Sequence, residues 1–352
     1  MPVTIPPRRR AVAVQSGLGG PVSGLHSSTT SGNVGRVKRC PIRKGETRVM
    51  RTAVADNYPT RDRNECTMTV RQDPVTWSDQ KRGDTRSGPL TANQIAVYDK
   101  RGYHSAESII PPRDVFNLVD EMTRLAETDT LRGDDRVVRE NGDGAVRSVF
   151  DVHRLSDVVD EIIRRPEVVG IARQILGSDV YVHQSRLNFK PGFSGGPFYW
   201  HSDFETWHAE DGMPTPRAAS ISIALTENYG HNGGLMIMPG SHRAFVSCAG
   251  ETPEDYYKES LVSYVPPTGS PDQPTLTRMA NEYGIDMMTG PAGSATVFDS
   301  NCMHGSNGNI TPFARSNLFI VFNSVENTLT DPFSAPAPRP DYLGSRDFTP
   351  LR

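Results

Sequence analysis

The stretch FYWHSDFETWHAEDGM, residues 198–213, decides how the rest of the chain is interpreted. Within it, His201 and Asp203 stand two residues apart, and side chains two apart in a strand point to the same face. The best third partner is His304, which follows an apolar run in the segment DSNCMHGS, residues 299–306. Two histidines and one carboxylate on one face of an octahedral ion form the facial triad of non-haem Fe(II) oxygenases. The spacing therefore predicts a metal site made by His201, Asp203 and His304.

A His-x-Asp pair alone is weak evidence, because most such pairs are an ordinary histidine beside a turn aspartate. A later cation makes the pattern more specific: Arg315 lies in TPFARSN, residues 311–317. The planar guanidinium of arginine grips a carboxylate through two parallel hydrogen bonds, as the far carboxylate of 2-oxoglutarate would require. The ordered series of His-x-Asp, histidine and arginine is thus more specific than any single member.

Longer segments around these residues carry a family resemblance. They are VHQSR (182–186), KPGF (190–193), residues 199–213, MPGSHR (238–243) and HGSNGNITP (304–312). From about Tyr58 to near the C-terminus, the chain resembles the ectoine hydroxylases of the phytanoyl-CoA dioxygenase superfamily of Fe(II)/2-oxoglutarate enzymes. The resemblance implies Fe(II) on His201, Asp203 and His304, with 2-oxoglutarate and O2 as cosubstrates. It also implies a double-stranded β-helix (jelly-roll, cupin-like) with the metal in its mouth.

The resemblance further assigns side chains to the two organic ligands. Contacts with 2-oxoglutarate would come from Asn188, Phe198, Ser220, Ser306 and Arg315. Contacts with ectoine would come from Gln184, Trp207, Ala218, Phe298 and Phe319. Aromatic faces attract a cation such as the amidine of ectoine, and a buried amide can fix its orientation. Residue type alone leaves other roles open: the serines suit ordinary strand or turn positions, the aromatic residues suit a core, and Asn188 suits either role.

The implied activity is hydroxylation of ectoine to 5-hydroxyectoine with release of succinate and CO2, as in compatible-solute biosynthesis under osmotic stress. A related hydroxylase acting on another small zwitterion, such as proline, is the first alternative. The second is a non-catalytic, metal-dependent binding protein on the same fold, because one fold hosts many functions. The complete set of His201, Asp203, His304 and Arg315 argues against this second alternative, since a simple binder needs no clamp for a cosubstrate.

Composition limits the cellular setting and the partners. The chain has no apolar run of membrane-spanning length, so no membrane-spanning segment is expected. Its 352 residues are enough to bury a substantial core without disulfides. Its four cysteines, Cys40, Cys66, Cys248 and Cys302, show no paired spacing and predict free thiols in the reducing cytoplasm. Cys302 stands two residues before His304, which leaves a metal-ligand role open beside a packing role.

Charge is distributed unevenly. Residues 1–52 carry ten Lys/Arg and one acid, Glu46, whereas the remainder has 28 basic and 40 acidic residues, a net charge of −12. An acidic body argues against nucleic-acid binding. The Gly-, Ser-, Pro- and Arg-rich residues 1–52 are expected to form a disordered basic extension, with a transit peptide as the alternative. Met50 is an alternative start, because the family likeness begins near Tyr58.

Residues 53–352 are expected to form one dioxygenase domain that is mainly β with flanking helices. An outer helical layer is predicted over about 91–177, where Thr91 begins a capping box and later segments show helical periodicity. Residues 128–147 read as a loop.

The β-helix core is predicted over about 180–325, where the periodicity changes to two. A strand is expected from Phe198 to Trp207. In residues 218–225, small side chains alternate with larger apolar ones, which predicts one face open to a ligand and one packed on helices. The polar, Pro-rich residues 247–285 are expected to form a long irregular insert, which is typical of a lid or a dimer contact, so a homodimer is left open.

Overall fold

The computed structural model describes residues 57–61, 64–77, 87–141 and 144–352. The predicted extension of residues 1–52 and the alternative start at Met50 lie outside this part of the chain. The division of the chain into an extension and one catalytic domain stays a prediction. Among the described residues, no helix combines the length and apolar character needed to cross a bilayer.

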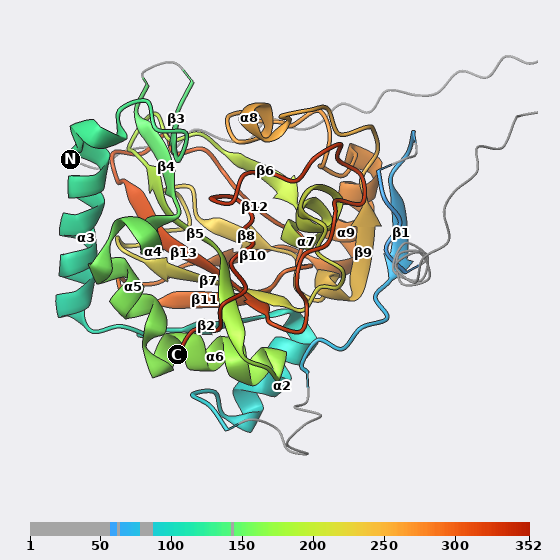
Figure 1. Ribbon diagram of the computed structural model, residues 1–352, viewed down its shortest axis with the longest axis horizontal. Coiled ribbons are helices and arrows are strands. Elements are labelled where there is room, and N and C mark those ends of the chain that lie inside the picture. Colours follow the sequence, from blue (N-terminus) through green and yellow to red (C-terminus); the bar gives the residue numbers. More distant parts are fainter. Residues whose placement is uncertain (1–56, 62–63, 78–86, 142–143) are drawn as a thin grey trace, which may run out of the picture. The chain divides into compact units, whose positions relative to one another are not determined.

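Helical residues are more frequent in the N-terminal half of the described chain, and strand residues are more frequent in the C-terminal half (Figure 1). The strands are β1 (Thr67–Val70), β2 (Tyr103–Ala106), β3 (Val137–Arg139), β4 (Val146–Phe150), β5 (Val180–Lys190), β6 (Phe198–His201), β7 (Ala218–Ala224), β8 (Leu235–Ile237), β9 (Ala244–Ser247), β10 (Asp286–Met288), β11 (Ala295–Asp299), β12 (His304–Ser306) and β13 (Arg315–Ser324). The helices are α2 (Ala92–Arg101), α3 (Pro112–Glu127), α4 (Val152–Leu155), α5 (Asp157–Arg164), α6 (Pro166–Leu176), α7 (Asp203–Thr206), α8 (Tyr257–Ser260) and α9 (Gln273–Tyr283). Three short helical turns complete the set: η1 (Asp129–Leu131), the π-helical η2 (Trp207–Asp211) and η3 (Ser241–Arg243).

Two sheets build the core of the described chain. The larger has the order β2-β11-β7-β13-β5-β4-β3, and the smaller has the order β10-β8-β12-β6. Every strand pairing within them is antiparallel, and a separate pair joins β1 to β9. The result is the mainly β architecture with flanking helices that the sequence predicts.

The larger sheet separates the helical layer from the site. Ile221 and Ile223 of β7 join one buried apolar cluster with side chains of α3, α5 and α6. Figure 1 shows these three helices together at the left and lower border of the sheet. The side chains of Ser220 and Ser222 point to the opposite face of β7 from these isoleucines. Ser220 contacts Asp203, and Ser222 lines a pocket. The small residues of this strand therefore face the site and its large residues pack under the helices, as the sequence predicts.

The helix boundaries follow from capping residues. Thr91 and Gln94 form a capping box at the start of α2, and Gly102 ends that helix with φ of 79°. Ser156 accepts a hydrogen bond from the backbone N–H of Val159 at the start of α5. These signals were local, so the sequence placed the helices correctly.

Three local predictions were wrong. The strand expected to reach Trp207 ends at His201, because Ser202 accepts from the N–H of Glu205 and begins α7. Residues 128–147 are not a simple loop, since they contain η1, β3 and the start of β4. Residues 247–285 contain α8 and α9 rather than irregular chain alone. The spacing Ser202-x-x-Glu205 is itself a helix-start signature, so the first error was avoidable.

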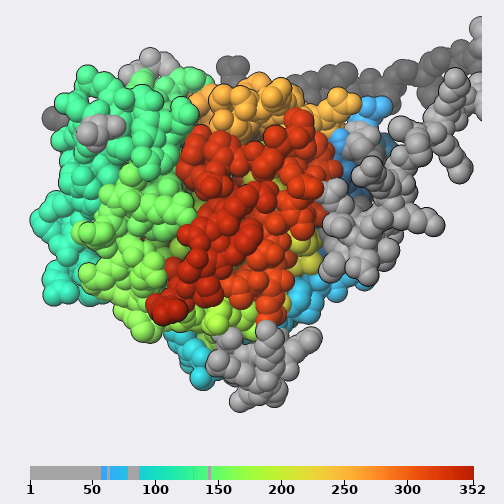
Figure 2. Space-filling model, in the orientation of Figure 1, coloured from blue at the N-terminus to red at the C-terminus, as the bar shows by residue number. Residues whose placement is uncertain are grey.

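The C-terminal segment lies beside β5 and covers one face of the described chain. Figure 2 shows these residues, in red, across the middle of that face. The N–H of Leu351 donates to the carbonyl of Val180 and the N–H of Ser345 donates to that of His183, both at 2.9 Å. The amide of Gln184 donates to the carbonyl of Leu343 at 2.6 Å. The segment therefore helps to set the orientation of a side chain that the sequence assigns to substrate.

One buried ion pair provides a stability prediction. Arg71 Nη1 donates to both carboxylate oxygens of Asp299 at 2.8 Å, and both side chains are buried. Arg71→Ala leaves that carboxylate without its partner, so we expect a loss of about 3–5 kcal/mol in the free energy of unfolding in urea. The control is Arg243→Ala, because the Arg243–Asp99 pair is about half exposed and should contribute at most ~1 kcal/mol. Equal losses in the two variants would contradict this difference.

Candidate metal centre and adjoining pockets

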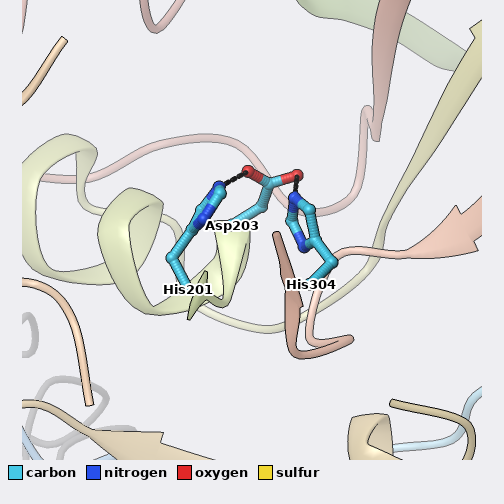
Figure 3. Close-up of side chains that lie close together, drawn as sticks. All are labelled: His201, Asp203 and His304. Carbon is cyan, nitrogen blue, oxygen red and sulfur yellow. Dashed lines mark ion pairs between the residues drawn. The ribbon is translucent and has the colours of Figure 1, made fainter. Parts of the chain in front are cut away.

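Three side chains from separate elements converge at the edge of the smaller sheet. His201 ends β6, Asp203 begins α7, and His304 begins β12, directly opposite His201 in the register. The Nε2 atom of His201 lies 3.6 Å from Asp203 Oδ1, and that of His304 lies 3.9 Å from Asp203 Oδ2 (Figure 3). One ligand atom from each residue lies within 4.8 Å of the others. The predicted trio is therefore assembled.

Backbone carbonyls orient both imidazoles. His201 Nδ1 donates to the carbonyl of Tyr199 at 2.7 Å, and His304 Nδ1 donates to that of Cys302 at 3.0 Å. A proton on Nδ1 leaves each Nε2 with a free lone pair, and these are the atoms that face Asp203. Imidazole and carboxylate donors suit a ferrous ion, so this donor set fits the metal implied by the sequence.

The charges at the trio also suit a cation. Burial, with the neighbouring His201, lowers the pKa of His304 to about 4, so its imidazole is neutral at neutral pH. Burial acts to raise the pKa of Asp203, but His304, His201 and Arg186 outweigh burial and hold it below its usual range. The site therefore offers an anionic oxygen ligand from Asp203 and a neutral nitrogen ligand from His304 without first losing a proton.

The reason that His201 and Asp203 meet differs from the one predicted. They do not share a strand face, because the chain turns into α7 between them. Ser202 fixes that turn as the helix cap, and Ser220 of β7 donates a hydrogen bond to Asp203 Oδ2 at 3.3 Å. The carboxylate is thus positioned by a helix start and by the facing sheet.

A first pocket, named the Arg315 pocket, opens on one side of the trio. Its lining includes Asn188, Lys190, Phe198, His201, His304, Ser306, Arg315 and Phe319. Four of the five residues predicted to contact 2-oxoglutarate are therefore together. The fifth, Ser220, is buried against Asp203 instead. Phe319, predicted for ectoine, lies in this pocket.

A second pocket, named the Trp207 pocket, opens on the other side. Its lining includes Arg61, Gln184, His201, Asp203, Trp207, Glu210, Tyr256 and Arg339. His201 lines both pockets, so the metal trio stands between them. Gln184 and Trp207, both predicted for ectoine, share this second pocket. Trp207 lies in η2, and its place in the pocket does not follow from strand parity as the sequence suggested.

Two other residues predicted for ectoine line neither pocket. Ala218 is fully buried at the start of β7. Phe298 is fully buried with its ring centroid 4.9 Å from that of His304, so it packs against the imidazole of a candidate metal ligand. Cys302 is also buried, and its thiol donates to the carbonyl of Gly102 at 3.2 Å, which is the packing alternative.

Several cations at the site were not predicted. Arg186 lines both pockets, and its guanidinium carbon lies 4.4 Å from the ring centroid of Phe319. Burial lowers its pKa to about 10, so it remains charged at neutral pH. Strand parity could have found it, because Arg186 lies between Gln184 and Asn188 on one face of β5.

Two further cations line the pockets: Lys190 at the end of β5, and Arg339 from the distant C-terminal segment. Lys190 Nζ donates to Ser306 Oγ at 2.8 Å and to the carbonyl of Asn307 at 2.6 Å. Arg339 of the C-terminal segment donates to both oxygens of Asp211, at 2.8 and 2.6 Å. No local periodicity marks Arg339 as a pocket residue, since it lies outside the described strands and helices.

Comparison with known proteins agrees with this geometry. A family model described as phytanoyl-CoA dioxygenase (PhyH) matches residues 98–317. The ectoine dioxygenase of Nocardia farcinica is 54% identical over 296 residues, which cover 84% of this chain and 95% of that protein. The ectoine dioxygenase of Streptomyces coelicolor is 55% identical over 301 residues, covering 86% and 98%.

Solved structures agree as well. EctD from S. alaskensis with bound Fe superposes with a TM-score of 0.74 at 41% identity, covering 84% of this chain and 97% of that chain. The same protein with 2-oxoglutarate and 5-hydroxyectoine gives a TM-score of 0.73 at 42% identity, covering 82% and 94%. Fold and site thus define a member of the phytanoyl-CoA dioxygenase family on a cupin-like, double-stranded β-helix. Within that family, the chain belongs to the ectoine dioxygenases.

Proposed function

We propose that this protein hydroxylates ectoine to 5-hydroxyectoine, using Fe(II), 2-oxoglutarate and O2 and releasing succinate and CO2. The observation that carries the proposal is the trio of His201, Asp203 and His304 between two separate pockets. A cosubstrate and a substrate must both reach one metal, and two pockets meeting at that metal meet this need. When bound, the iron supplies the activation of O2 that is coupled to decarboxylation of 2-oxoglutarate.

The Arg315 pocket is the proposed 2-oxoglutarate site. Arg315 is buried, and its Nη1 donates to the carbonyl of Gly233 at 3.2 Å, so its guanidinium retains donors for a carboxylate. Ser306 Oγ accepts from Lys190 Nζ, which leaves the hydroxyl proton of Ser306 free to donate to the same carboxylate. Burial and the neighbouring Arg315 lower the pKa of Lys190 well below its usual value. Binding of 2-oxoglutarate, a dianion, would offset the electrostatic repulsion between Lys190 and Arg315.

The Trp207 pocket is the proposed ectoine site. Its charged lining is mixed, with Arg61, Arg186 and Arg339 beside Asp203 and Glu210, and Arg61 pairs with Glu210 at 2.6 Å. Such a lining suits a zwitterion better than an ion of one sign. The indole of Trp207 can face the cationic amidine, and the amide of Gln184 is held in place by the C-terminal segment.

Residues 256–270 supply another part of the same pocket. Tyr256, Leu261, Pro266 and Thr268 lie in its lining, although they belong to the segment predicted as a lid or a dimer contact. Their position favours the lid. We propose that this segment limits the access of water to the reacting carbon, which protects the oxidant from side reactions.

The decisive test uses anaerobic protein loaded with Fe(II) and 2-oxoglutarate. Ectoine or proline is added, O2 is admitted, and product mass and succinate are measured. Hydroxylated ectoine with equal succinate is the expected result. Hydroxylated proline with untouched ectoine would restrict the proposal to the reaction type. No succinate with either solute would favour the non-catalytic binding protein.

Substitutions in the Trp207 pocket should separate substrate from cosubstrate. We expect Trp207→Ala and Gln184→Ala to lower ectoine hydroxylation by on the order of a hundredfold, because displacement of a reacting atom by about 1 Å can cost that much. The Kd of 2-oxoglutarate should change little, and succinate should exceed hydroxylated product. Tyr229→Ala, which removes a half-exposed aromatic ring outside both pockets, is the control. Tightly coupled turnover at the parental rate in both pocket variants would overturn the assignment.

A further inference from the structure

Cys66 and Cys248 lie opposite each other on neighbouring chain segments. β1 and β9 pair antiparallel, with Thr67 opposite Ser247 at one end of the ladder. The next step of this register places Cys66 opposite Cys248, and the two thiols are hydrogen-bonded to each other. Both are free cysteines, as the sequence predicts, but tertiary structure makes them a pair.

The hydrogen-bond pattern places this pair at a narrow position of the ladder. The N–H of Arg71 donates to the carbonyl of Arg243 at 2.9 Å, so these two opposed residues form a hydrogen-bonded pair. Such pairs alternate with non-hydrogen-bonded ones along an antiparallel ladder, and Cys66–Cys248 is an odd number of steps away. At non-hydrogen-bonded positions the Cα atoms lie about 4.5 Å apart, within the range that a disulfide spans.

The two thiols differ in a way that suits exchange chemistry. Cys66 is half-buried, and its Sγ accepts from the backbone N–H of Asp272, the N-cap of α9, at 3.4 Å. The hydrogen bond from Cys248 lowers the pKa of Cys66 to about 7, which makes Cys66 the nucleophile at neutral pH. Cys248 is buried, and burial raises its pKa well above the usual value, so it remains a thiol until its partner is modified.

We propose that Cys66 and Cys248 form a redox-active dithiol, which a small-molecule disulfide converts into a reversible cross-strand disulfide. The Cys66 thiolate attacks one sulfur of the small disulfide, whose S–S bond breaks and releases one thiolate. That thiolate takes the Cys248 proton, and Cys248 Sγ attacks Cys66 Sγ and expels the second small thiolate, which takes up the proton that Cys66 lost. The protein loses two electrons and two protons, and one small disulfide becomes two thiols.

The pair adjoins the wall of the Trp207 pocket. The backbone N–H of Cys248 donates to Glu205 Oε1 at 3.3 Å, and Glu205 forms an ion pair with the buried Arg61 at 2.6 Å. Arg61 lines that pocket and precedes Cys66 by a few residues. A disulfide would therefore fasten the chain segment that carries Arg61 to β9. The exchange itself needs neither iron nor substrate, so it can be tested apart from the proposed function.

The test uses the full-length Fe(II)-loaded protein, incubated anaerobically in mixtures of reduced and oxidised glutathione. Free thiols are then alkylated, and intact mass and peptide mapping are measured. The expected result is loss of two hydrogens per chain and a Cys66–Cys248 cross-linked peptide, both reversed by reduced glutathione. Cys40→Ser is the control and should keep the cross-link.

Single substitutions assign the order of attack. Cys248→Ala should accumulate a glutathione adduct on Cys66, because no second thiol can expel it, whereas Cys66→Ser should leave Cys248 unmodified. Amide hydrogen exchange over residues 64–70 should slow on oxidation of the parent and remain unchanged in Cys66→Ser. A stable glutathione adduct on Cys66 in the parent, or a cross-link through Cys40, would overturn the proposal.

Discussion

Replacing Asp203 with alanine is expected to abolish both iron binding and turnover. Asp203 supplies the only carboxylate of the candidate triad and faces the Nε2 atoms of His201 and His304. Residues that merely orient metal ligands already contribute about 10–100-fold to affinity or activity, and removal of a ligand should cost more than that. His201→Ala and His304→Ala should each have the same effect.

The readouts for these variants are iron content after anaerobic loading, turnover and melting temperature. Folding should survive, because the three residues lie at element ends beside the pockets rather than in the apolar cluster under the helices. The matched control is His231→Ala, which removes a histidine that stacks on Tyr229 away from the trio. A triad variant that retains parental iron content and activity would remove its residue from the metal site.

The second large effect is expected for Arg315→Lys, as weaker binding of 2-oxoglutarate. Arg315 is buried, its Nε has no partner among the described residues, and burial lowers its pKa to about 10. A buried cation in this state is suited to an anionic ligand. Lysine keeps the charge but loses the planar fork, and one charge-assisted hydrogen bond contributes about 2 kcal/mol, roughly thirtyfold in Kd.

Calorimetric titration of 2-oxoglutarate into anaerobic Fe(II)-loaded protein measures this effect, and the KM for ectoine is measured separately. We expect the Kd of 2-oxoglutarate to rise while the KM for ectoine changes little, because Arg315 lines only one of the two pockets at the metal. Arg243→Lys, an exposed arginine outside both pockets, should leave both constants unchanged. Equal weakening of both ligands by Arg315→Lys would indicate general disruption instead.

Local pattern was sufficient for several helices and strands of the described chain. Capping residues and apolar periodicity placed α2, α3, α5 and α6, and the period of two placed β5 and β7. The wrong prediction of a strand beyond His201 also came from local pattern. The residues that follow His201 are compatible with a continued strand or with a helix start, and the helix cap at Ser202 selects the helix. Trp207 reached its pocket through η2, which no parity argument foresees.

By itself, the sequence was sufficient to determine the family and to select the candidate metal ligands and the arginine that follows them, because these depend on residue type, order and short spacing. Only the tertiary structure decided which distant residues meet. It brought Arg339 of the C-terminal segment into the Trp207 pocket, it placed the carbonyl of Leu343 against the amide of Gln184, and it placed Cys66 opposite Cys248. The physical reason is that periodicity and capping act within a few residues, whereas strand register and packing depend on contacts between segments far apart in the chain.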